Sequence, residues 1–313
     1  MQSEQIEKIL SLHLTRSLPH HAIKDVYFYA SLPGGKLFRP HLVWSILKDL
    51  NPTQYLDSIQ NFNSNHAYLS SAVEFHHTYT LLHDDLPAMD NDLTRRGKPC
   101  THIAFGEWQA LLAGDGLLNI SYQLIAKVKH PRFQEVFRFM SWALGPKGLI
   151  HGQVMDLNHE MTKNFANTLR THELKTARLI QTAILGSAIL AKTSPDSAKE
   201  KKLWRYSRLL GVNFQLIDDL SELAEETLSE HELDVNPWIH FKDEAYQETL
   251  KGLADFKKLA IDLKLKHTDM IVADYYKKML TIIEPNLVHI NKHTNGSLDL
   301  IPVILLMKTF GDA

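Results

Sequence analysis

Apolar residues recur every three or four positions along almost the whole chain, and this spacing limits the possible folds more than any other feature. Leu174, Ala177, Ile180 and Ile184 form one such series, and this spacing is the period of an α-helix. Strict alternation over the length of a strand is hard to find, and neither GxGxxG nor GxxxxGKS/T occurs. The sequence therefore predicts an all-α fold instead of a sheet-based nucleotide-binding domain.

Helices should end where proline, glycine and asparagine cluster, because these residues disfavour the helix interior. None of these breaks is long enough to link two domains, and the chain has no internal repeat. Residues 1–313 are thus expected to form a single helical domain. The predicted breaks are residues 31–36, 49–54, 87–99, 129–132, 144–148, 193–197 and 235–237.

The composition excludes several classes of function. Lys and Arg number 34 and Asp and Glu 36, so no general basic surface would attract nucleic acid or an anionic membrane. Cys100 is the only cysteine, which rules out an intrachain disulfide and a thiolate metal cluster. Residues 1–18 are typical of an amphipathic helix, and no stretch is apolar enough to span a membrane. We expect a soluble cytoplasmic protein without a nucleic-acid partner.

The first acidic cluster follows an apolar helical run. Asp84 and Asp85 stand at the expected end of that helix, just before Pro87. A helix C-terminus carries partial negative charge, so two aspartates are unfavourable there unless a cation is bound. Asp90 and Asp92 lie beyond the break and are expected to fold back toward the same cation.

A second acidic cluster lies at residues 218–222. Asp218 and Glu222 are four residues apart and share one helix face, where like charges repel, and Asp219 is adjacent. Carboxylate oxygens suit Mg²⁺, which keeps several waters and is usually shared with substrate phosphates. One acidic cluster alone is more often a solvated helix end. Two clusters beside cations that can hold phosphate favour a metal–phosphate site.

Basic residues occur at three places where phosphate could bind. Lys36 and Arg39 follow a Gly-Gly turn, which would let a phosphate approach the backbone closely. An Arg-Arg pair at 95–96 follows the first acidic cluster, and Lys175 precedes Thr176 on a later helix. Adjacent ammonium and hydroxyl donors of this kind could hold a second diphosphate.

Six segments resemble, in this order, the trans-prenyltransferases and especially the bacterial short-chain farnesyl diphosphate synthases. The resemblance implies an antiparallel helix bundle around a deep cavity, usually a homodimer. It also implies condensation of isopentenyl diphosphate with dimethylallyl or geranyl diphosphate, which yields farnesyl diphosphate and pyrophosphate. The segments are GGKLFRP, HTYTLLHDDLPAMDNDLTRRGKP, AFGEWQALLAGDGLLN, HGQVMDL, LKTARL and FQLIDDLSE.

The resemblance implies roles for single residues as well. Lys175 and the three principal metal ligands would be the catalytic group, and Mg²⁺, as three ions with substrate bound, would neutralise the departing diphosphate. The metal ligands would be Asp84, Asp90 and Asp218, supported by Asp85, Asp219 and Glu222. The isopentenyl diphosphate site would consist of Lys36, Arg39, His77 and Arg96, and the allylic diphosphate site of Arg95, Lys175, Thr176 and Gln215.

In this family the side chain five residues before the first aspartate often closes the product cavity, and here it is Tyr79. It would lie about 7–8 Å along the helix from the carboxylates. A bulky ring there favours farnesyl over geranylgeranyl diphosphate. Gln153 and Asp156 also match family positions, and we expect them to support the site, whereas Phe105 and Trp108 are expected in the core.

The sequence departs from the family at the second acidic motif. Glu222 replaces the usual aspartate, and Leu233 stands where the family has a lysine that assists the leaving group, with Lys242 as a displaced substitute. Two alternatives therefore stay open. One is a catalytically weak or inactive homologue that binds prenyl diphosphates or partners an active subunit. The other is a terpene cyclase, which would have no use for an isopentenyl site.

Overall fold

The computed structural model describes residues 1–296 and 298–311, and at residues 230 and 231 it describes the backbone alone. It confirms the all-α fold. In the described ranges the helices follow one another with short connections, and the strands form one small hairpin.

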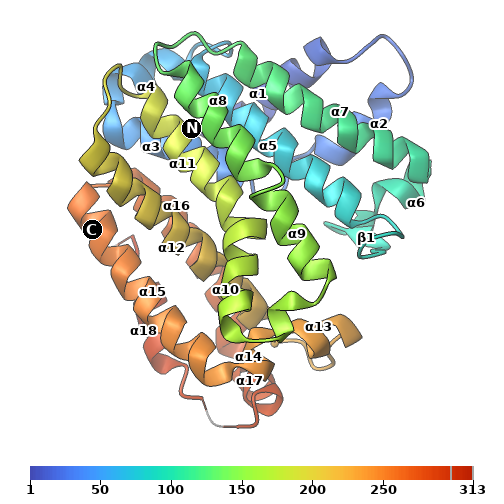
Figure 1. Cartoon of the computed structure of the whole chain (residues 1–313), viewed down its shortest axis with the longest axis vertical. Coiled ribbons are helices and arrows are strands. Elements are labelled where there is room, and N and C mark those ends of the chain that lie inside the picture. Colours follow the sequence, from blue (N-terminus) through green and yellow to red (C-terminus); the bar gives the residue numbers. More distant parts are fainter. Residues whose placement is uncertain (297, 312–313) are drawn as a thin grey trace. The chain divides into compact units, whose positions relative to one another are not determined.

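The chain packs into two compact units. The first consists of residues Met1–Phe137 and Gly186–Ser194. Helices α8 (Phe133–Leu144) and α11 (Arg178–Leu190) each have one end in this unit. Its other elements, blue to green in Figure 1, are α1 (Ser3–Ser17), α2 (Lys24–Ser31), α3 (Phe38–Leu50), α4 (Pro52–Ile59), α5 (Asn65–Asp84), β1 (Thr94–Arg95), β2 (Lys98–Pro99), α6 (Thr101–Phe105) and α7 (Glu107–Ala126).

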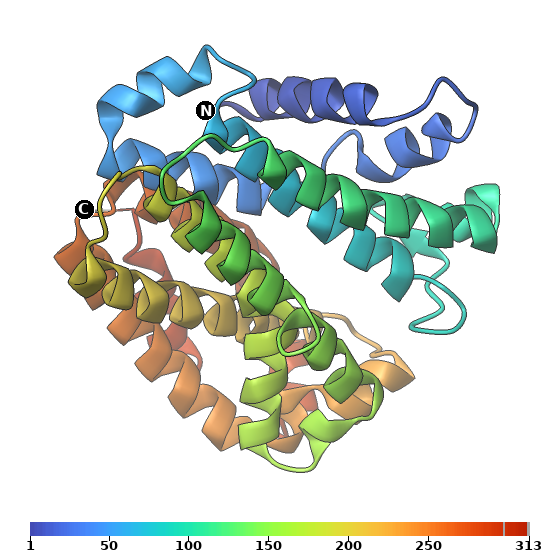
Figure 2. The same cartoon turned by 45° about the horizontal axis from the view of Figure 1, so that its top comes forward.

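Helix α5 is the central helix of the first unit. It packs against α1, α2, α3, α4 and α7, and Figures 1 and 2 both show α5 and α7 side by side. The helix begins where the Ser64 hydroxyl accepts a hydrogen bond from the Ala67 N–H, at 3.3 Å. Most of its side chains are buried, including the polar Glu74 and His76. A helix held on so many sides is a rigid support for the aspartates at its end.

The second unit consists of residues Arg138–Leu185 and Pro195–Ala313. Its elements are α9 (Leu149–Leu157), η1 (Glu160–Thr162), α10 (Phe165–His172), η2 (Glu173–Ala177), α12 (Ser197–Glu222), α13 (Glu230–Val235), α14 (Pro237–His240), α15 (Lys242–Leu263), α16 (Lys266–Ile283), η3 (Glu284–Asn286), α17 (Leu287–His293) and α18 (Ile301–Lys308).

Helix α12 is the central helix of the second unit and packs against α10, η2, α14, α15 and α16. On one side the buried Tyr206 ring stacks on Phe256 of α15, with 4.5 Å between centroids. On another side Gly211 meets η2. A Cβ at Gly211 would lie 2.3 Å from the Ala177 Cβ, so only glycine permits this close approach. The second acidic motif therefore ends a well-buried helix.

Each break predicted from the sequence separates two helices, but the hairpin formed by β1 and β2 was not predicted. Thr94 pairs with Pro99 and Arg95 with Lys98. The turn between them consists of Arg96 and Gly97, which have φ values of 55° and 75°. Tight two-residue hairpin turns require positive φ, which Gly97 adopts at no steric cost.

The prediction that Trp108 lies in the core is wrong, because its side chain is 61% exposed. Helix α7 turns its small residues toward α5. A Cβ at Gly114 would lie 2.2 Å from His83 Nε2, so the helices approach too closely for large side chains. Trp108, Leu111 and Leu112 lie on the outer face instead. Phe105 is half-buried, with its ring centroid 5.1 Å from that of Tyr29.

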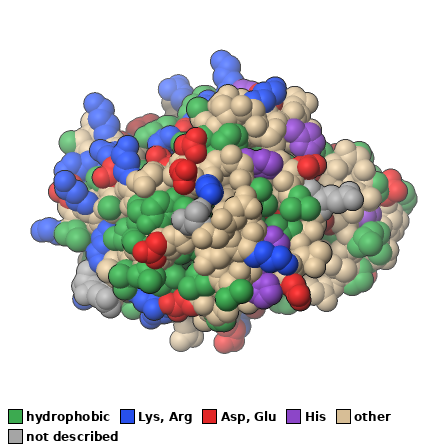
Figure 3. Space-filling view, turned by 90° about the horizontal axis from the view of Figure 1, so that it is seen from below, with side chains coloured by type: hydrophobic (Ala, Val, Ile, Leu, Met, Phe, Trp, Pro, Cys, Tyr) green, Lys and Arg blue, Asp and Glu red, His purple; other side chains and the backbone are tan. Residues whose placement is uncertain are grey.

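Across the described residues, no helix is both long and apolar enough to cross a membrane. Figure 3 shows side chains of both charge signs interspersed on one face, in keeping with the net charge of -2.

Candidate functional site

The first acidic motif folds back on itself after the end of α5. Helix α5 ends at Asp84, and after Pro87 the chain reverses so that the Asp90 N–H donates to the Asp84 carbonyl oxygen, at 2.9 Å. This hydrogen bond holds the half-buried Asp84 and the exposed Asp90 at one place, as the sequence led us to expect. The backbone thus holds the two aspartates of the first motif close together.

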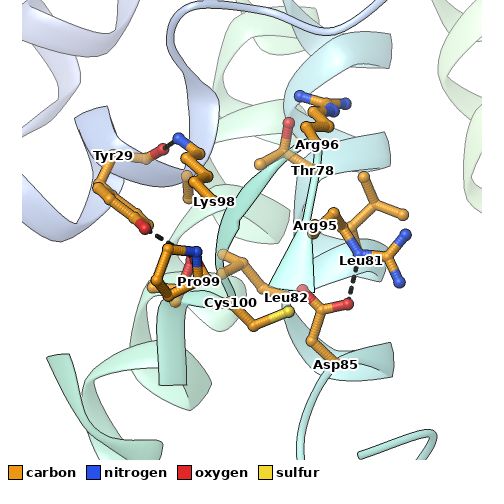
Figure 4. Close-up of a pocket in the computed structure, with 12 residues that line it drawn as sticks. Tyr29, Thr78, Leu81, Leu82, Asp85, Arg95, Arg96, Lys98, Pro99 and Cys100 are labelled. Carbon is orange, nitrogen blue, oxygen red and sulfur yellow. Dashed lines mark hydrogen bonds and ion pairs between the residues drawn. The ribbon is translucent and has the colours of Figure 1, made fainter. Parts of the chain in front are cut away.

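The carboxylate of Asp85 is engaged by an arginine. The Arg95 Nε donates to Asp85 Oδ1 at 2.5 Å, and its Nη2 donates to Asp92 Oδ2 at 2.6 Å. Figure 4 shows the contact between Arg95 of the hairpin and Asp85, the residue that follows α5. Asp85 is 4% exposed, whereas the side chain of the arginine that it contacts is 32% exposed. The roles assigned to Asp85 in metal binding and to Arg95 in diphosphate binding remain predictions.

Arg39, His77 and Arg96 come together in the first unit, although they come from α3, α5 and the hairpin turn. Burial, followed by the positive charges of Arg39, Arg96 and Arg95, holds the pKa of His77 well below its ordinary value. Gly35 makes room for the cluster, since a Cβ there would lie 2.6 Å from the Arg96 Cζ. The Gly-Gly turn thus leaves room for the Arg96 guanidinium, and its expected role in phosphate binding stays a prediction.

Three further residues of this region were not predicted from the sequence: Glu74, Lys98 and Tyr29. Glu74 is buried one turn before His77; burial raises its pKa, and Arg39 and Arg96 oppose that shift. Lys98 donates a hydrogen bond to the Tyr29 carbonyl oxygen, and its Nζ lies 4.0 Å from the centroid of the Tyr29 ring. Glu74 could have been noticed as a carboxylate within an apolar helical run, but Tyr29 gave no signal.

A pocket lies beside the hairpin formed by β1 and β2. Asp85, Arg95, Arg96 and Lys98 line it, as Figure 4 shows, together with apolar side chains of α5. The exposed Lys36 lies two residues before α3 and does not line this pocket. The pocket offers three cationic side chains and only one carboxylate, which suits an anionic ligand such as a diphosphate.

Tyr79 is buried on α5, one and a half turns before Asp84. Its side chain is 6% exposed. The rings of His76 and His83 meet it edge to face, with centroids 4.6 and 5.6 Å away. The ring thus fills the space between these two histidines, and its expected role in closing the product cavity stays a prediction.

In the second unit, predicted ligand residues form one chain of hydrogen bonds. The Thr176 hydroxyl donates to Gln215 Oε1 at 2.9 Å, and Gln215 Nε2 donates to Asp219 Oδ1 at 2.8 Å. Asp219 Oδ2 lies 3.3 Å from His172 Nε2. Burial raises the pKa of Asp219, and the Gln215 hydrogen bond opposes that shift. The structure therefore brings Thr176, Gln215 and the second acidic motif together.

Lys175 lies beside this chain and is oriented by Asp156, whose Oδ2 accepts from the ammonium at 2.5 Å. This contact fixes the position of the Lys175 ammonium, and the supporting role expected of Asp156 stays a prediction. Gln153 lies on the same helix, α9, and is half-buried. Asp218 is half-buried on the last turn but one of α12.

Helix α13 places another carboxylate, Glu232, next to the second motif. Asn236 Nδ2 donates both to Glu232 Oε2, at 3.1 Å, and to the Asp219 carbonyl oxygen, at 2.8 Å. The next helix is anchored by the fully buried Trp238, whose Nε1 donates to the Leu216 carbonyl oxygen at 2.7 Å. The resemblance to the family implies a lysine in this segment, whereas here Glu232 adds a negative charge. Leu233, which stands at the position of that lysine, is 48% exposed. Whether Lys242, the first residue of α15, substitutes for that lysine stays a prediction.

Glu222 should make the metal-free protein less stable at high pH. Burial, then the charges of Asp219 and Glu232, raise its pKa above the ordinary 4.5. Above pH 4.5 the unfolded chain releases this proton while the folded chain retains it, so stability falls as pH rises toward the raised pKa. We expect Glu222→Gln to raise the melting temperature at pH 8 in a chelating buffer, with little effect near pH 4.5.

The control for this prediction is Glu226→Gln, since Glu226 is exposed on the following turn. Thermal unfolding followed by circular dichroism at both pH values measures the difference. Equal melting temperatures for wild type and Glu222→Gln at pH 8 would contradict a strained carboxyl group at this position.

The donor groups fit Mg²⁺ that is shared with a substrate. Asp84 and Asp90 offer carboxylate oxygens in the first unit, and Asp218 and Glu222 offer them in the second. Within the ranges that the structure describes, no three His, Cys, Asp or Glu side chains gather tightly enough to hold a metal ion by themselves. Mg²⁺ commonly binds through one or two carboxylates and completes its shell with water and phosphate oxygens. The residues present fit that mode of binding.

An all-helical fold with two such carboxylate motifs and a cluster of phosphate-type cations is that of a prenyltransferase. The sequence profile of the polyprenyl synthetases matches residues 20–231, and the chain belongs to this family. The resemblance seen in the sequence is thereby confirmed.

Several characterised proteins are similar to the chain. The farnesyl diphosphate synthase of Geobacillus stearothermophilus is 33% identical over 72% of this chain and 75% of that enzyme. The geranylgeranyl diphosphate synthase of Cyanophora paradoxa is 35% identical over 71% and 72%, respectively. A geranyltransferase from Helicobacter pylori, solved with magnesium and isoprenyl diphosphate, superimposes with a TM-score of 0.75 at 25% identity and covers 88% of this chain and 96% of its own.

Proposed function

We propose that this prenyltransferase condenses isopentenyl diphosphate with an allylic diphosphate, in the presence of Mg²⁺, to give farnesyl diphosphate and pyrophosphate. One observation carries the proposal: Arg39, His77 and Arg96 gather around α5 in addition to the two acidic motifs. An enzyme with a single diphosphate substrate does not need this additional cationic site. The cluster therefore favours a two-substrate condensation over a terpene cyclase.

The cationic cluster of the first unit would hold the substrate that attacks. Arg39 and Arg96 would bind the diphosphate of isopentenyl diphosphate with charge-assisted hydrogen bonds. His77 stays neutral, because burial and its arginine neighbours lower its pKa. It therefore adds a polar contact without further positive charge. A fixed diphosphate converts a bimolecular encounter into an oriented one.

The residues of the second unit would hold the allylic substrate. Lys175 and Thr176 are adjacent donors, held in place by Asp156 and Gln215. They would bind the diphosphate while the carbon–oxygen bond breaks and an allylic carbocation forms. Bound Mg²⁺, as three ions by analogy with the family, would supply the positive charge that stabilises the leaving diphosphate. The isopentenyl double bond then attacks the cation, and the released diphosphate is the expected acceptor of the proton lost in the last step.

Farnesyl diphosphate is our proposed product because the buried Tyr79 ring stands where the family limits the product cavity. Relatives that make the fifteen-carbon and the twenty-carbon products are about equally similar to the chain. Overall similarity therefore does not distinguish the two products, and the side chain at position 79 is the basis of our choice.

The second motif supports a second candidate function, a catalytically weak or inactive homologue. Glu232 places a carboxylate near Glu222, in the segment where the family has a lysine. A lost cation and an added anion both disfavour the departure of a diphosphate. One missing contact of this kind slows such a step by about 10²- to 10³-fold. A homologue of this type would bind prenyl diphosphates and partner an active subunit.

The assay that separates these candidates supplies isopentenyl diphosphate with dimethylallyl or geranyl diphosphate, and mass spectrometry sizes the products. We expect farnesyl diphosphate to form with Mg²⁺, to disappear when a chelator removes the metal, and to return when Mg²⁺ is restored. Binding of both substrates without any condensation would establish the inactive homologue instead. A cyclic hydrocarbon formed from one substrate would establish a cyclase.

We also propose a homodimer located in the cytoplasm. Ile103, Trp108, Leu111 and Leu112 expose apolar side chains on α6 and α7. A second copy of the chain would bury this surface.

A further inference from the structure

The turn that carries Lys175 and Thr176 is a π-helix. Helix α10 ends at His172, the π-helical η2 covers Glu173–Ala177, and α11 begins at Arg178. Figure 1 shows α10 and α11 following one another along this path. Single π-helical turns inside α-helices are rare and less favourable than regular turns, so this one must be stabilised by its surroundings.

Two neighbouring helices leave room for the π-helical turn. A Cβ at Gly152 of α9 would lie 2.3 Å from the Lys175 backbone nitrogen. On α12 the equivalent atom of Gly211 would lie 2.3 Å from the Ala177 Cβ. Both glycines let the backbone of the turn approach closely, but they do not explain why the turn is π-helical in preference to α-helical.

An ion pair spans the turn from its first residue to the residue that follows it. Arg178 Nη2 donates to Glu173 Oε1 at 2.7 Å. Residues five apart in a regular α-helix point about 140° away from each other. In a π-helical turn the hydrogen bond runs from residue i to i+5, which places these two residues one above the other. The pair therefore forms readily only when the turn is π-helical.

Other contacts hold both partners of the pair in place. Arg208 Nε of α12 donates to the second oxygen of Glu173 at 2.8 Å. The Arg178 guanidinium carbon lies 4.6 Å from the Trp142 ring centroid and 5.3 Å from that of Trp204. The Arg178 side chain is 4% exposed and that of Glu173 11% exposed. Little water reaches the pair, so its attraction is weakly screened.

We propose that the ion pair between Glu173 and Arg178 keeps η2 in its π-helical form and so positions Lys175 and Thr176 for a diphosphate. Glu173 is then a positioning residue, which acts through its neighbours without touching substrate. If the turn became α-helical, the side chains of Lys175 and Thr176 would rotate away from Asp156 and Gln215. This inference rests on the allylic site of the proposed function and explains how the chain builds that site.

The test is the affinity for geranyl diphosphate in the presence of Mg²⁺, measured by calorimetry on the full chain. Glu173→Gln keeps the shape of the side chain and removes its charge. We expect it to weaken binding of geranyl diphosphate about tenfold, as for other residues that orient a ligand-binding group. Binding of isopentenyl diphosphate should change less than twofold, because its site lies in the first unit and does not involve η2.

Asp255→Asn is the matched control, since it breaks the exposed ion pair between Arg205 and Asp255, which are 2.6 Å apart. It should leave both affinities unchanged. Should Glu173→Gln fail to fold, the milder Arg178→Lys is measured in the same way. This variant keeps the charge and loses the planar guanidinium. We expect it too to weaken binding of geranyl diphosphate more than that of isopentenyl diphosphate.

Three outcomes decide the inference. Selective loss of geranyl diphosphate binding supports it. Unchanged affinity for geranyl diphosphate, or equal losses for both substrates, overturns it and leaves the ion pair a purely structural role, whatever happens to the melting temperature. A wild-type chain that binds no geranyl diphosphate overturns it as well. Since the readout is binding, a wild type that binds both substrates and fails to condense them disproves the proposed function alone.

Discussion

Replacing Asp84 by alanine should lower the rate of condensation about 10³-fold or more, because the first motif then loses a carboxylate that the proposed metal site needs. The remaining ligand, Asp90, is exposed and is held near Asp84 by a backbone hydrogen bond that the substitution keeps. The cation would thus lose its half-buried ligand while the loop keeps its shape.

The same substitution removes a negative charge from the C-terminal end of a helix. Asp84 is the last residue of α5, where the helix dipole disfavours a negative charge. Asp57→Ala, at an exposed position on α4, is the control and should keep the full rate. Steady-state rates with geranyl diphosphate give the comparison, and an Asp84→Ala rate within tenfold of wild type would rule out Asp84 as a principal ligand.

Replacing Tyr79 by alanine should change the main product from fifteen to twenty carbons. The ring is buried between His76 and His83, and neither histidine is free to move into the space that the ring leaves. His76 Nδ1 is hydrogen-bonded to the Ser121 hydroxyl at 3.2 Å, and His83 Nε2 to the Leu111 carbonyl oxygen at 3.1 Å. Where neighbours cannot collapse, removal of a large side chain leaves a cavity.

That cavity would accept the longer chain that forms when the fifteen-carbon product condenses with another isopentenyl diphosphate. Tyr79→Phe is the matched control, since it keeps the ring and should keep farnesyl diphosphate as the product. Mass spectrometry of the products made from geranyl diphosphate distinguishes the two variants. The same product distribution from Tyr79→Ala and wild type would show that another side chain limits the product.

The helices and the place of the first motif could be predicted from the sequence because both depend on neighbours along the chain. Apolar spacing gave the helices, and proline and glycine gave their ends. Asp84 and Asp90 meet because Pro87 stops α5 and a short loop reverses the chain. The partnership of Thr176 with Gln215 was different, since the two residues are far apart in sequence and only the resemblance to a known family linked them.

The residues that the sequence did not reveal depend on contacts between distant segments. In the sequence Arg178 resembles an ordinary surface arginine. In the structure the rings of Trp142 and Trp204 lie beside it. The π-helical form of η2 leaves no mark in the apolar spacing of that segment. Trp108 was assigned to the core, whereas the narrow separation of α5 and α7 decides that it lies outside. Packing distances of this kind are not encoded in local periodicity.

The two carboxylates that hold Arg95 have a consequence for how tightly an anion can bind beside them. The guanidinium already makes charge-assisted hydrogen bonds to Asp85 and Asp92, so a diphosphate must compete with both. Binding is then an exchange of anions on one arginine. The free energy gained on binding is the difference between the pairing of Arg95 with the diphosphate and its pairing with the two carboxylates. Each carboxylate that is released must find a new positive partner. A cation that arrives together with the diphosphate would supply that partner, which makes the two ligands mutually dependent at this arginine.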